Sequence, residues 1–564
     1  MVNTNFLFLI LIICLLLLSG GGADHAEYLR WAEYFYTFDI GVFDKLNKHG
    51  LGLHKSENGL PLTSWSYGSG IFTAFINKIF FFIKKDIPIE ISSLLVSTLN
   101  LLLLSKILDQ KKIQKLNKLF LICIFILFFP GGFYINKESS ETWTIFLTLF
   151  SIFLIEDRNK KNFFVNLFII GICFYFLLLV KIPNIFICIF LFINLIVNNI
   201  KNQKINKIFS KKIIYICFLI FFFLLPIILI SIYQKIVFDA FFTNAYSFGD
   251  ESISSFSVKN FKLNEILFST WHGLFFYHPF YVIINFYLIY FLFKNKLDSK
   301  IYILTLIHFF LIISQILIQS SWSFWWMGTG TYGSRGFSGV STVTFYIFVY
   351  MINKHQNIKI NNILIFASII LLIWNTFLFY FGETNFVNFD SFINKIIRPH
   401  SIILLIKILL IILFFLLLKI IYKLNNLYFL KLTLISLTFF VFFSNIYSNF
   451  KINGVIVVII FCLLSYFIIK SSILFDFTNN KLREIIRTFL NISFIALFFT
   501  SLFFQYNLFI NFNNSKNINY SNGANFNCID LRQTLDEYKY IEGYDIDKQL
   551  WEKFFLKKCS NVLN

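Results

Sequence analysis

The sequence predicts an all-α, polytopic integral membrane protein with about thirteen to fifteen transmembrane helices. Hydrophobic residues make up 57% of its 564 residues, charged residues only 14%, and the mean hydropathy is +0.73. These values exclude an ordinary soluble globular protein. The net charge of +20 is explained by lysine- and arginine-rich cytoplasmic loops. Because no RNA- or DNA-binding pattern is present, we expect no nucleic-acid partner.

Apolar segments recur along most of the chain, separated by polar loops. Segments close to the roughly 20 residues that a bilayer requires are expected at 6–19, 88–105, 119–134, 142–155, 163–180, 184–199, 213–234, 278–293, 301–319, 340–352, 363–381, 401–418, 427–447, 455–469 and 488–507. The shorter stretches 25–38 and 69–83 are expected to lie along the membrane surface. The chain thus divides into a membrane domain, 1–507, and a small extracytoplasmic tail, 508–564.

The distribution of lysine and arginine orients these segments. With the N-terminus in the cytoplasm, the expected cytoplasmic loops carry 24 of these residues, and the outer loops after residue 134 carry 9. Basic residues favour the cytoplasmic side, so this excess supports the orientation. The outer face then carries loops 20–87, 135–141, 180–184, 235–277 and 320–339. The tail also lies there, where Cys528 and Cys559 would be able to form a disulfide.

The outer loops hold acids, cations and aromatic residues together. Asp24 and His25 directly follow the first apolar segment, where a carboxylate beside the bilayer is costly unless it is paired or used. The same loop contains Lys55 and the run Pro-Leu-Thr-Ser-Trp-Ser-Tyr-Gly-Ser-Gly at 61–70. Loop 320–339 contains Ser-Trp-Ser-Phe-Trp-Trp-Met-Gly-Thr-Gly-Thr-Tyr-Gly-Ser-Arg-Gly at 321–336.

These residue types suit transfer of a sugar from a polyprenyl phosphate, whose tail stays in the lipid bilayer. The phosphate leaves with negative charge, which cations such as Arg335, Lys55 or Lys137 would stabilise. The acceptor needs a base to take its proton, and we assign this role to Asp24. Tryptophan and tyrosine suit both sugar faces and the membrane interface. The glycines of loop 320–339 permit close backbone approach to a ligand.

Three motifs give the sequence a resemblance to a known family. They are Asp-His-x-x-Tyr-Leu-x-x-Ala at 24–32, the Gly-rich aromatic stretch 65–70, and Trp-Trp-x-Gly-x-x-x-Tyr-Gly-x-Arg at 325–335. In these motifs the chain resembles the integral-membrane GT-C glycosyltransferases, in their protein-mannosyltransferase-like and aminoarabinose-transferase-like branch. The segment Trp-His-Gly-Leu-Phe-Phe-Tyr-His-Pro at 271–279 is also similar to one in bacterial members.

The resemblance implies a GT-C-like fold and an active site on the outer face of the cell's inner membrane. It implies that Asp24 is the base or a metal-associated carboxylate, and that Glu138, or with less support Glu141, is the second catalytic acid. If a metal takes part, it is a divalent ion such as Mg²⁺ or Mn²⁺, held by Asp24 and Glu138. The expected partners are a polyprenyl-phosphate-linked sugar donor, membrane lipid, and a glycan, lipid or protein acceptor. The residues expected to bind substrate are His25, Lys55, Tyr67, Trp325, Tyr332 and Arg335.

Several of these residues also fit simpler interpretations. Asp24 is a favoured N-cap for the helix expected after it, and Glu138 and Glu141 fit a solvated turn. We expect His272 and His278 at the membrane interface rather than as ligands. Lys181, between two expected spans, fits a side chain that snorkels to the outer surface.

Two other functions are compatible with a chain of many spans. A polysaccharide polymerase or ligase would use a lipid diphosphate donor and favour paired outer arginines, which are few here. A transporter or flippase of lipid-linked saccharides would show charged residues within spans or broken helices along a central path.

Overall fold

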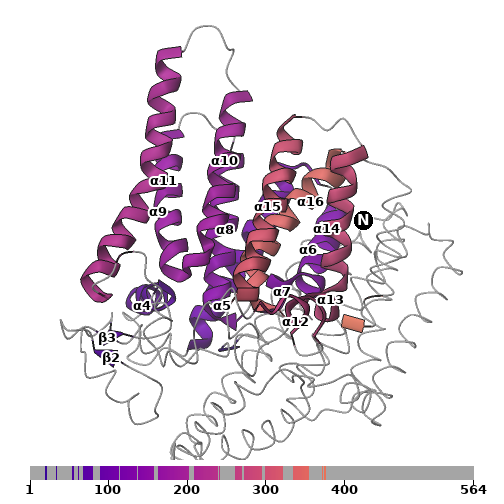
Figure 1. The fold of residues 1–564 in the computed structure, drawn as a ribbon, viewed down its shortest axis with the longest axis horizontal. Coiled ribbons are helices and arrows are strands. Elements are labelled where there is room, and N and C mark those ends of the chain that lie inside the picture. Colours follow the sequence, from indigo (N-terminus) through magenta and orange to yellow (C-terminus); the bar gives the residue numbers. More distant parts are fainter. Residues whose placement is uncertain are drawn as a thin grey trace, which may run out of the picture. The chain divides into compact units, whose positions relative to one another are not determined.

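The computed structural model is that of an all-α protein. It describes residues 20–21, 34, 54–55, 61–62, 68–80, 89–113, 115–135, 137–157, 163–201, 209–238, 241, 261–269, 272–294, 299–321, 334–354, 371 and 374–375. These residues are overwhelmingly helical (Figure 1), which confirms the all-α part of the prediction. The expected first span and the tail with its two cysteines lie outside the described residues, as do nearly all the residues of the spans expected after residue 354.

The long helices stand side by side, upright in the view of Figure 1. They are α5 (Ile89–Gln110), α6 (Lys115–Phe128), α8 (Ser140–Glu156), α9 (Phe163–Val180), α10 (Ile185–Lys201), α11 (Phe209–Phe238), α14 (Pro279–Lys294), α15 (Ser299–Ser321) and α16 (Ser338–Lys354). Apart from 119–134, each apolar segment expected between residues 88 and 352 therefore lies almost entirely within one of these helices.

Shorter helices gather at the lower ends of the long ones in this view. They are α4 (Gly68–Phe80), α7 (Pro130–Tyr134), α12 (Leu263–Phe268) and α13 (Leu274–Tyr277). All four belong to segments that the sequence assigned to the outer face or to its edge. The described part of the chain thus collects these segments at one end of the helices.

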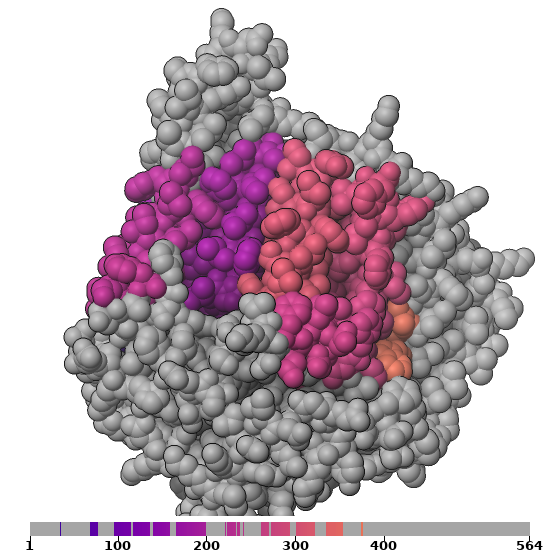
Figure 2. Space-filling model, in the orientation of Figure 1, coloured from indigo at the N-terminus to yellow at the C-terminus, as the bar shows by residue number. Residues whose placement is uncertain are grey.

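Helix α8 lies at the centre of the described helices. It packs against α5, α9, α10 and α16, and both α10 and α16 pack against α15. The space-filling view shows α10 and α15 in direct contact on the visible face (Figure 2). The residues of α8 that face these neighbours are buried, among them Trp143, Ile145, Leu149 and Ile152.

One described helix, Lys300–Ser321, is long and apolar enough to cross a membrane, with 22 residues and a mean hydropathy of 2.4 over its most apolar window. Shorter apolar helices within the described residues are Asn117–Phe128, Val165–Val180, Ile182–Asn198, Phe223–Ile236 and Pro279–Tyr290. By length and composition alone, the structure therefore supports membrane association through one helix.

Two small strand pairs interrupt the helical pattern in the described residues. β1 (Gly20–Gly21) pairs in parallel with β4 (Lys137–Glu138), with Gly21 opposite Glu138. β2 (His54–Lys55) pairs antiparallel with β3 (Pro61–Leu62), with Lys55 opposite Pro61. The β2–β3 pair lies within the first outer loop. The β1–β4 pair joins this loop to the turn before α8.

The expected span 119–134 is not one straight helix, because α6 ends at Phe128 and α7 starts at Pro130. Proline suits the first turn of a helix, where its missing N–H is not needed. Gly132 makes the sharp bend possible, since its backbone lies directly against the end of α6. A Cβ at this position would lie 2.2 Å from the Ile126 oxygen and 2.3 Å from the Phe125 oxygen.

Replacing Gly132 by alanine is therefore expected to destabilise the protein by about 1–3 kcal/mol, because backbone atoms cannot yield as a side chain can. The unfolding temperature of the purified protein in detergent measures this effect. Gly336→Ala is the matched control, because a Cβ there would meet only the end of the Gln319 side chain, at 2.6 Å. Equal unfolding temperatures for the two variants would contradict the interpretation.

Candidate functional site

The site is built around Glu141, in the first turn of α8. Ser139 caps this helix, because its Oγ accepts a hydrogen bond from the Thr142 N–H at 3.3 Å. A carboxylate in the first helical turn is favoured by the helix dipole. Only 1% of Glu141 is exposed, so its charge has to be compensated by protein groups.

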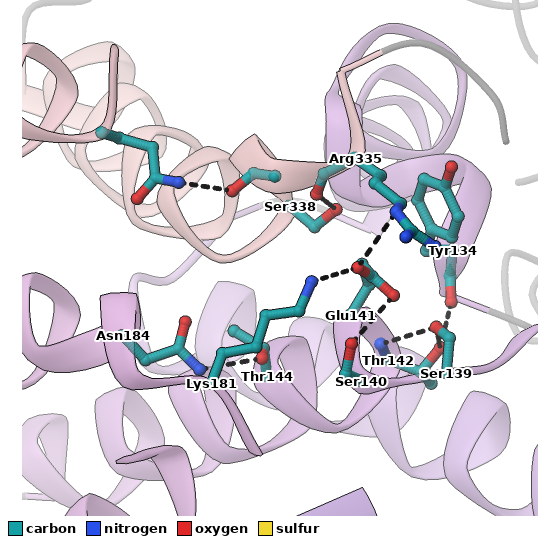
Figure 3. A network of polar contacts seen from close by, with 12 residues as sticks. Tyr134, Ser139, Ser140, Glu141, Thr142, Thr144, Lys181, Asn184, Arg335 and Ser338 are labelled. Carbon is teal, nitrogen blue, oxygen red and sulfur yellow. Dashed lines mark hydrogen bonds and ion pairs between the residues drawn. The ribbon is translucent and has the colours of Figure 1, made fainter. Parts of the chain in front are cut away.

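Two cations from distant parts of the chain supply this compensation (Figure 3). Lys181 Nζ donates to Glu141 Oε1, and Arg335 Nε lies 3.9 Å from the same oxygen. The Ser140 hydroxyl donates to the other oxygen, Oε2, at 3.2 Å. Among these three charged side chains, two cations face one carboxylate, which leaves an excess of one positive charge.

The electrostatics of Glu141 follow from this arrangement. The sequence places Glu141 in the outer turn 135–141, before the span expected at 142–155. Burial by itself raises the pKa of Glu141, but the charges of Lys181 and Arg335 more than offset this effect and lower the pKa from 4.5 to about 2. The carboxylate is therefore ionised at neutral pH.

The position of Lys181 results from a break between α9 and α10. The short helix η2 (Ile182–Asn184) joins them, and Pro183 ends the regular pattern of α9. Asn184 fixes the break by donating to the Leu177 carbonyl at 2.9 Å and to Thr144 Oγ1 on α8 at 3.1 Å. Lys181 therefore lies where the end of α9 meets α8.

The first residue of α4 sits on the same turn. A Cβ on Gly68 would lie 2.6 Å from the carbonyl carbon of Leu179 and from the nitrogen of Val180. The backbones are in contact here, and only glycine allows this approach. Gly68 belongs to the Gly-rich aromatic motif that the sequence identified at 65–70. This glycine therefore lies next to the residue before Lys181.

Arg335 is held by the short helix η4 (Arg335–Phe337), directly before α16. Gln315 on α15 donates to the Gly336 carbonyl at 3.0 Å, and the Ser338 hydroxyl donates to the Arg335 carbonyl. The Ser334 hydroxyl donates to the carbonyl of His272. The segment 271–279, singled out in the sequence, thus contacts the turn that carries the arginine.

The structure describes the two candidates for the second acid to different extents. Glu141, given less support than Glu138 by the sequence, lies beside Arg335. The solvated-turn interpretation is wrong for Glu141, because this side chain is buried. For Glu138 the structure describes the backbone in β4, which lies beside the chain three residues before Asp24.

The other predicted site residues have different outcomes. The backbone of Lys55 lies in β2 and pairs with Pro61 of β3. His272 and His278 are 2% and 1% exposed, so both are buried within the protein rather than lying at its surface. The predicted site residues that lie outside the described residues are Asp24, His25, Tyr67, Trp325 and Tyr332.

The described residues contain no group of three or more His, Cys, Asp or Glu side chains arranged to hold a metal ion. Glu141 does not suit a divalent cation, because Lys181 and Arg335 already face Oε1 and the Ser140 hydroxyl donates to Oε2. We therefore assign no step to a metal at this carboxylate.

Sequence reasoning gave Lys181 only a minor role and did not connect it with Glu141. A signal was available in both cases. Lys181 is followed by Ile-Pro between two apolar segments, which marks a helix break at the end of α9. Glu141 lies at the start of α8, the helix before α9, and the start of one helix lies at the same end of the bundle as the end of the next. Comparison with protein-family models, with curated proteins and with solved structures found no match for this chain.

Proposed function

We propose that the protein is a multi-pass membrane glycosyltransferase of GT-C type, which moves a sugar from a polyprenyl phosphate to an extracytoplasmic glycan, lipid or protein. The observation that carries the proposal is the convergence of Lys181 and Arg335 on Glu141 at one end of the helices. The same end holds the β1–β4 pair, from which the chain runs on to Asp24.

The membrane part of the proposal is supported by the surfaces of three helices. On α11, Phe221, Leu224, Ile228 and Ile232 are between 44% and 56% exposed. Large exposed apolar side chains also follow α14 and α15, among them Phe286, Tyr290, Leu306, Phe310 and Leu317. Contiguous apolar surface of this kind suits lipid contact better than water.

The chemistry is supported by the charge of the site. The leaving phosphate gains negative charge as its bond to the sugar breaks, and two nearby cations stabilise that charge. In this proposal Arg335 and Lys181 face the donor phosphate. Glu141 holds the two cations close together, and Asp24 takes the proton of the acceptor. Because Asp24 lies three residues after β1, the chain needs only a short path to bring it to this end.

The test of the proposal is a transfer assay with purified protein in liposomes. A panel of polyprenyl-phosphate monosaccharides is supplied as donors, a membrane extract of glycans, lipids and proteins is supplied as the acceptor, and the release of free polyprenyl phosphate is measured. Replacing Arg335 by methionine is expected to lower the rate about 10²–10³-fold, as removal of one charge-stabilising donor does elsewhere. Arg335→Lys should keep part of the rate, because the charge remains while the planar fork is lost.

Lys235→Met is the control for this series, because Lys235 is an exposed basic residue near the end of α11, with its ammonium group 5.8 Å from the centre of the Phe241 ring. It should leave the rate unchanged. An Arg335→Met protein that folds normally and releases polyprenyl phosphate at the wild-type rate would refute the assignment.

One observation favours a second function, transport of a lipid-linked saccharide. His308 lies midway along α15, is 2% exposed, and its Nε2 lies 2.7 Å from Thr344 Oγ1 on α16. An ionisable residue within a span often marks a transport path. The same assay separates the two functions, because a transporter would move the labelled donor across the bilayer without releasing free polyprenyl phosphate.

A further inference from the structure

A second buried polar cluster lies at the other end of α8, centred on Glu156. Lys111 Nζ lies 2.6 Å from Glu156 Oε2, and Lys300 Nζ lies 3.4 Å from Oε1. The Tyr346 hydroxyl donates to Oε1 as well. The ring of Tyr350 lies beneath both ammonium groups, 4.2 Å from Lys111 Nζ and 5.1 Å from Lys300 Nζ.

This cluster joins several helices that are distant in the sequence. Glu156 is the last residue of α8, Lys111 follows α5, Lys300 opens α15, and Tyr346 and Tyr350 lie on α16. Lys300 also donates to Asn198 on α10. The segments that meet here are those whose loops the sequence assigned to the cytoplasm, opposite the end that holds Glu141.

Polar contacts from η4 and α16 therefore meet α8 at both of its ends. Arg335, in η4, meets Glu141 at one end, and Tyr346, midway along α16, meets Glu156 at the other. The 15 residue steps from Glu141 to Glu156 span about 22 Å of helix.

At the Glu141 end α16 packs tightly against its neighbours. A Cβ on Gly339 of α16 would lie 2.6 Å from Thr144 Cγ2 of α8 and 2.4 Å from Ile187 Cδ1 of α10. Ser341 of α16 accepts a hydrogen bond from the N–H of Gly131, on α7, at 2.9 Å. Close-packed helices transmit a displacement rather than absorb it.

We propose that the Tyr346–Glu156 contact is a positioning device that sets the register of α16 on α8 and thereby holds Arg335 beside Glu141 at the far end. A buried polar contact fixes one arrangement of two helices, whereas apolar side chains alone accept several registers. Loss of the tyrosine hydroxyl frees α16 to shift along α8, and the shift separates Arg335 from Glu141. The proposal rests on the proposed function only where it makes Arg335 a phosphate-binding residue.

The experiment is amide hydrogen exchange on the purified full-length protein in lipid nanodiscs, with no substrate present. The main variant is Tyr346→Phe, which removes one hydroxyl and leaves both lysines on Glu156. We expect exchange to increase about tenfold in residues 334–338 and 139–144, at the end remote from the substitution. Glu156→Gln should do the same, and the phenylalanine variant keeps the test valid if the glutamine variant does not fold.

Two controls separate positioning from general loss of stability. Asp109→Asn removes an ion pair with Lys118 at the same end of the helices, where Asp109 is 51% exposed, and should leave the remote segments unchanged. Leu167→Ala removes buried volume on α9 and should raise exchange throughout the bundle, without preference for 334–338. Increased exchange confined to residues near 346, or a pattern equal to that of Leu167→Ala, would overturn the proposal.

The transfer assay adds an arm that keeps the two proposals distinguishable. If the protein is a transferase, Tyr346→Phe should raise the KM for the donor about tenfold while the stability is nearly kept. Remote exchange that increases in a protein without transferase activity would sustain the positioning role and refute only the function. Unchanged exchange in a Tyr346→Phe protein that transfers sugar at the normal rate would refute the positioning role and leave the proposed function standing.

Discussion

Asp24→Asn is expected to abolish transfer, with a loss of about 10²–10⁴-fold in the rate of polyprenyl phosphate release. An asparagine keeps the size and the helix-capping ability of aspartate but cannot accept a proton. The variant therefore separates the two interpretations of this residue. If Asp24 only capped the helix after it, the rate would be unchanged, because asparagine caps as well as aspartate does.

Asp39→Asn is the matched control for this experiment, because Asp39 is another carboxylate of the same outer loop. It should transfer at the wild-type rate. Both variants should also be compared by their yield of folded protein from membranes and by their unfolding temperatures. A normal rate for Asp24→Asn in properly inserted protein would end the assignment of Asp24 as the base.

Glu141→Gln is expected to have the largest effect on stability, lowering the free energy of unfolding by about 3–5 kcal/mol. The substitution keeps the shape of the side chain but leaves Lys181 and Arg335 facing each other without the carboxylate between them. The unfolding temperature in detergent measures the loss. A protein with an unaltered unfolding temperature would show that the cations are compensated in another way.

Two comparisons give this result its meaning. Asp109→Asn breaks an exposed ion pair and should cost at most about 1 kcal/mol. The double variant Glu141→Gln/Lys181→Met should lose less stability than the sum of its two single variants, because removing both partners leaves one fewer unpaired charge. Simple additivity would mean that the two side chains act independently.

The pH dependence of the same comparison has a definite sign. The pKa of Glu141 is lowered to about 2, so its contribution is complete above its ordinary pKa of 4.5 and is lost as the pH falls toward 2. The difference between wild type and Glu141→Gln should thus be constant between about pH 8 and pH 6 and narrow below about pH 4.5. A difference that widens on acidification would contradict the ionised state.

The helices were predictable from the sequence because their apolar segments are long and continuous. Turns such as that at Pro183, and the limits of α9 at Phe163 and Val180, agree with expectation to within a residue or two. The bend at Pro130 was not predicted, since proline next to glycine inside an apolar segment is compatible with either a kink or a complete break.

The site was predictable only in part, because pairing between distant residues leaves no local trace. Arg335 was identified from its glycine and tryptophan neighbours, and the acids before α8 from their place in an outer turn. Whether Glu138 or Glu141 faces the bundle depends on where the helix starts, and the two acids are only three residues apart. The Glu156 cluster was missed because its lysines served equally well as topological signals.

The contact between Gly68 and the last turn of α9 has a mechanical consequence. The backbone of Gly68, in the first outer loop, contacts the backbone of Val180, the residue before Lys181, with no side chain between them. A displacement of the last turn of α9, and with it of Lys181, is therefore expected to move the first turn of α4 as well. The position of Lys181 beside Glu141 is thus coupled directly to the first outer loop.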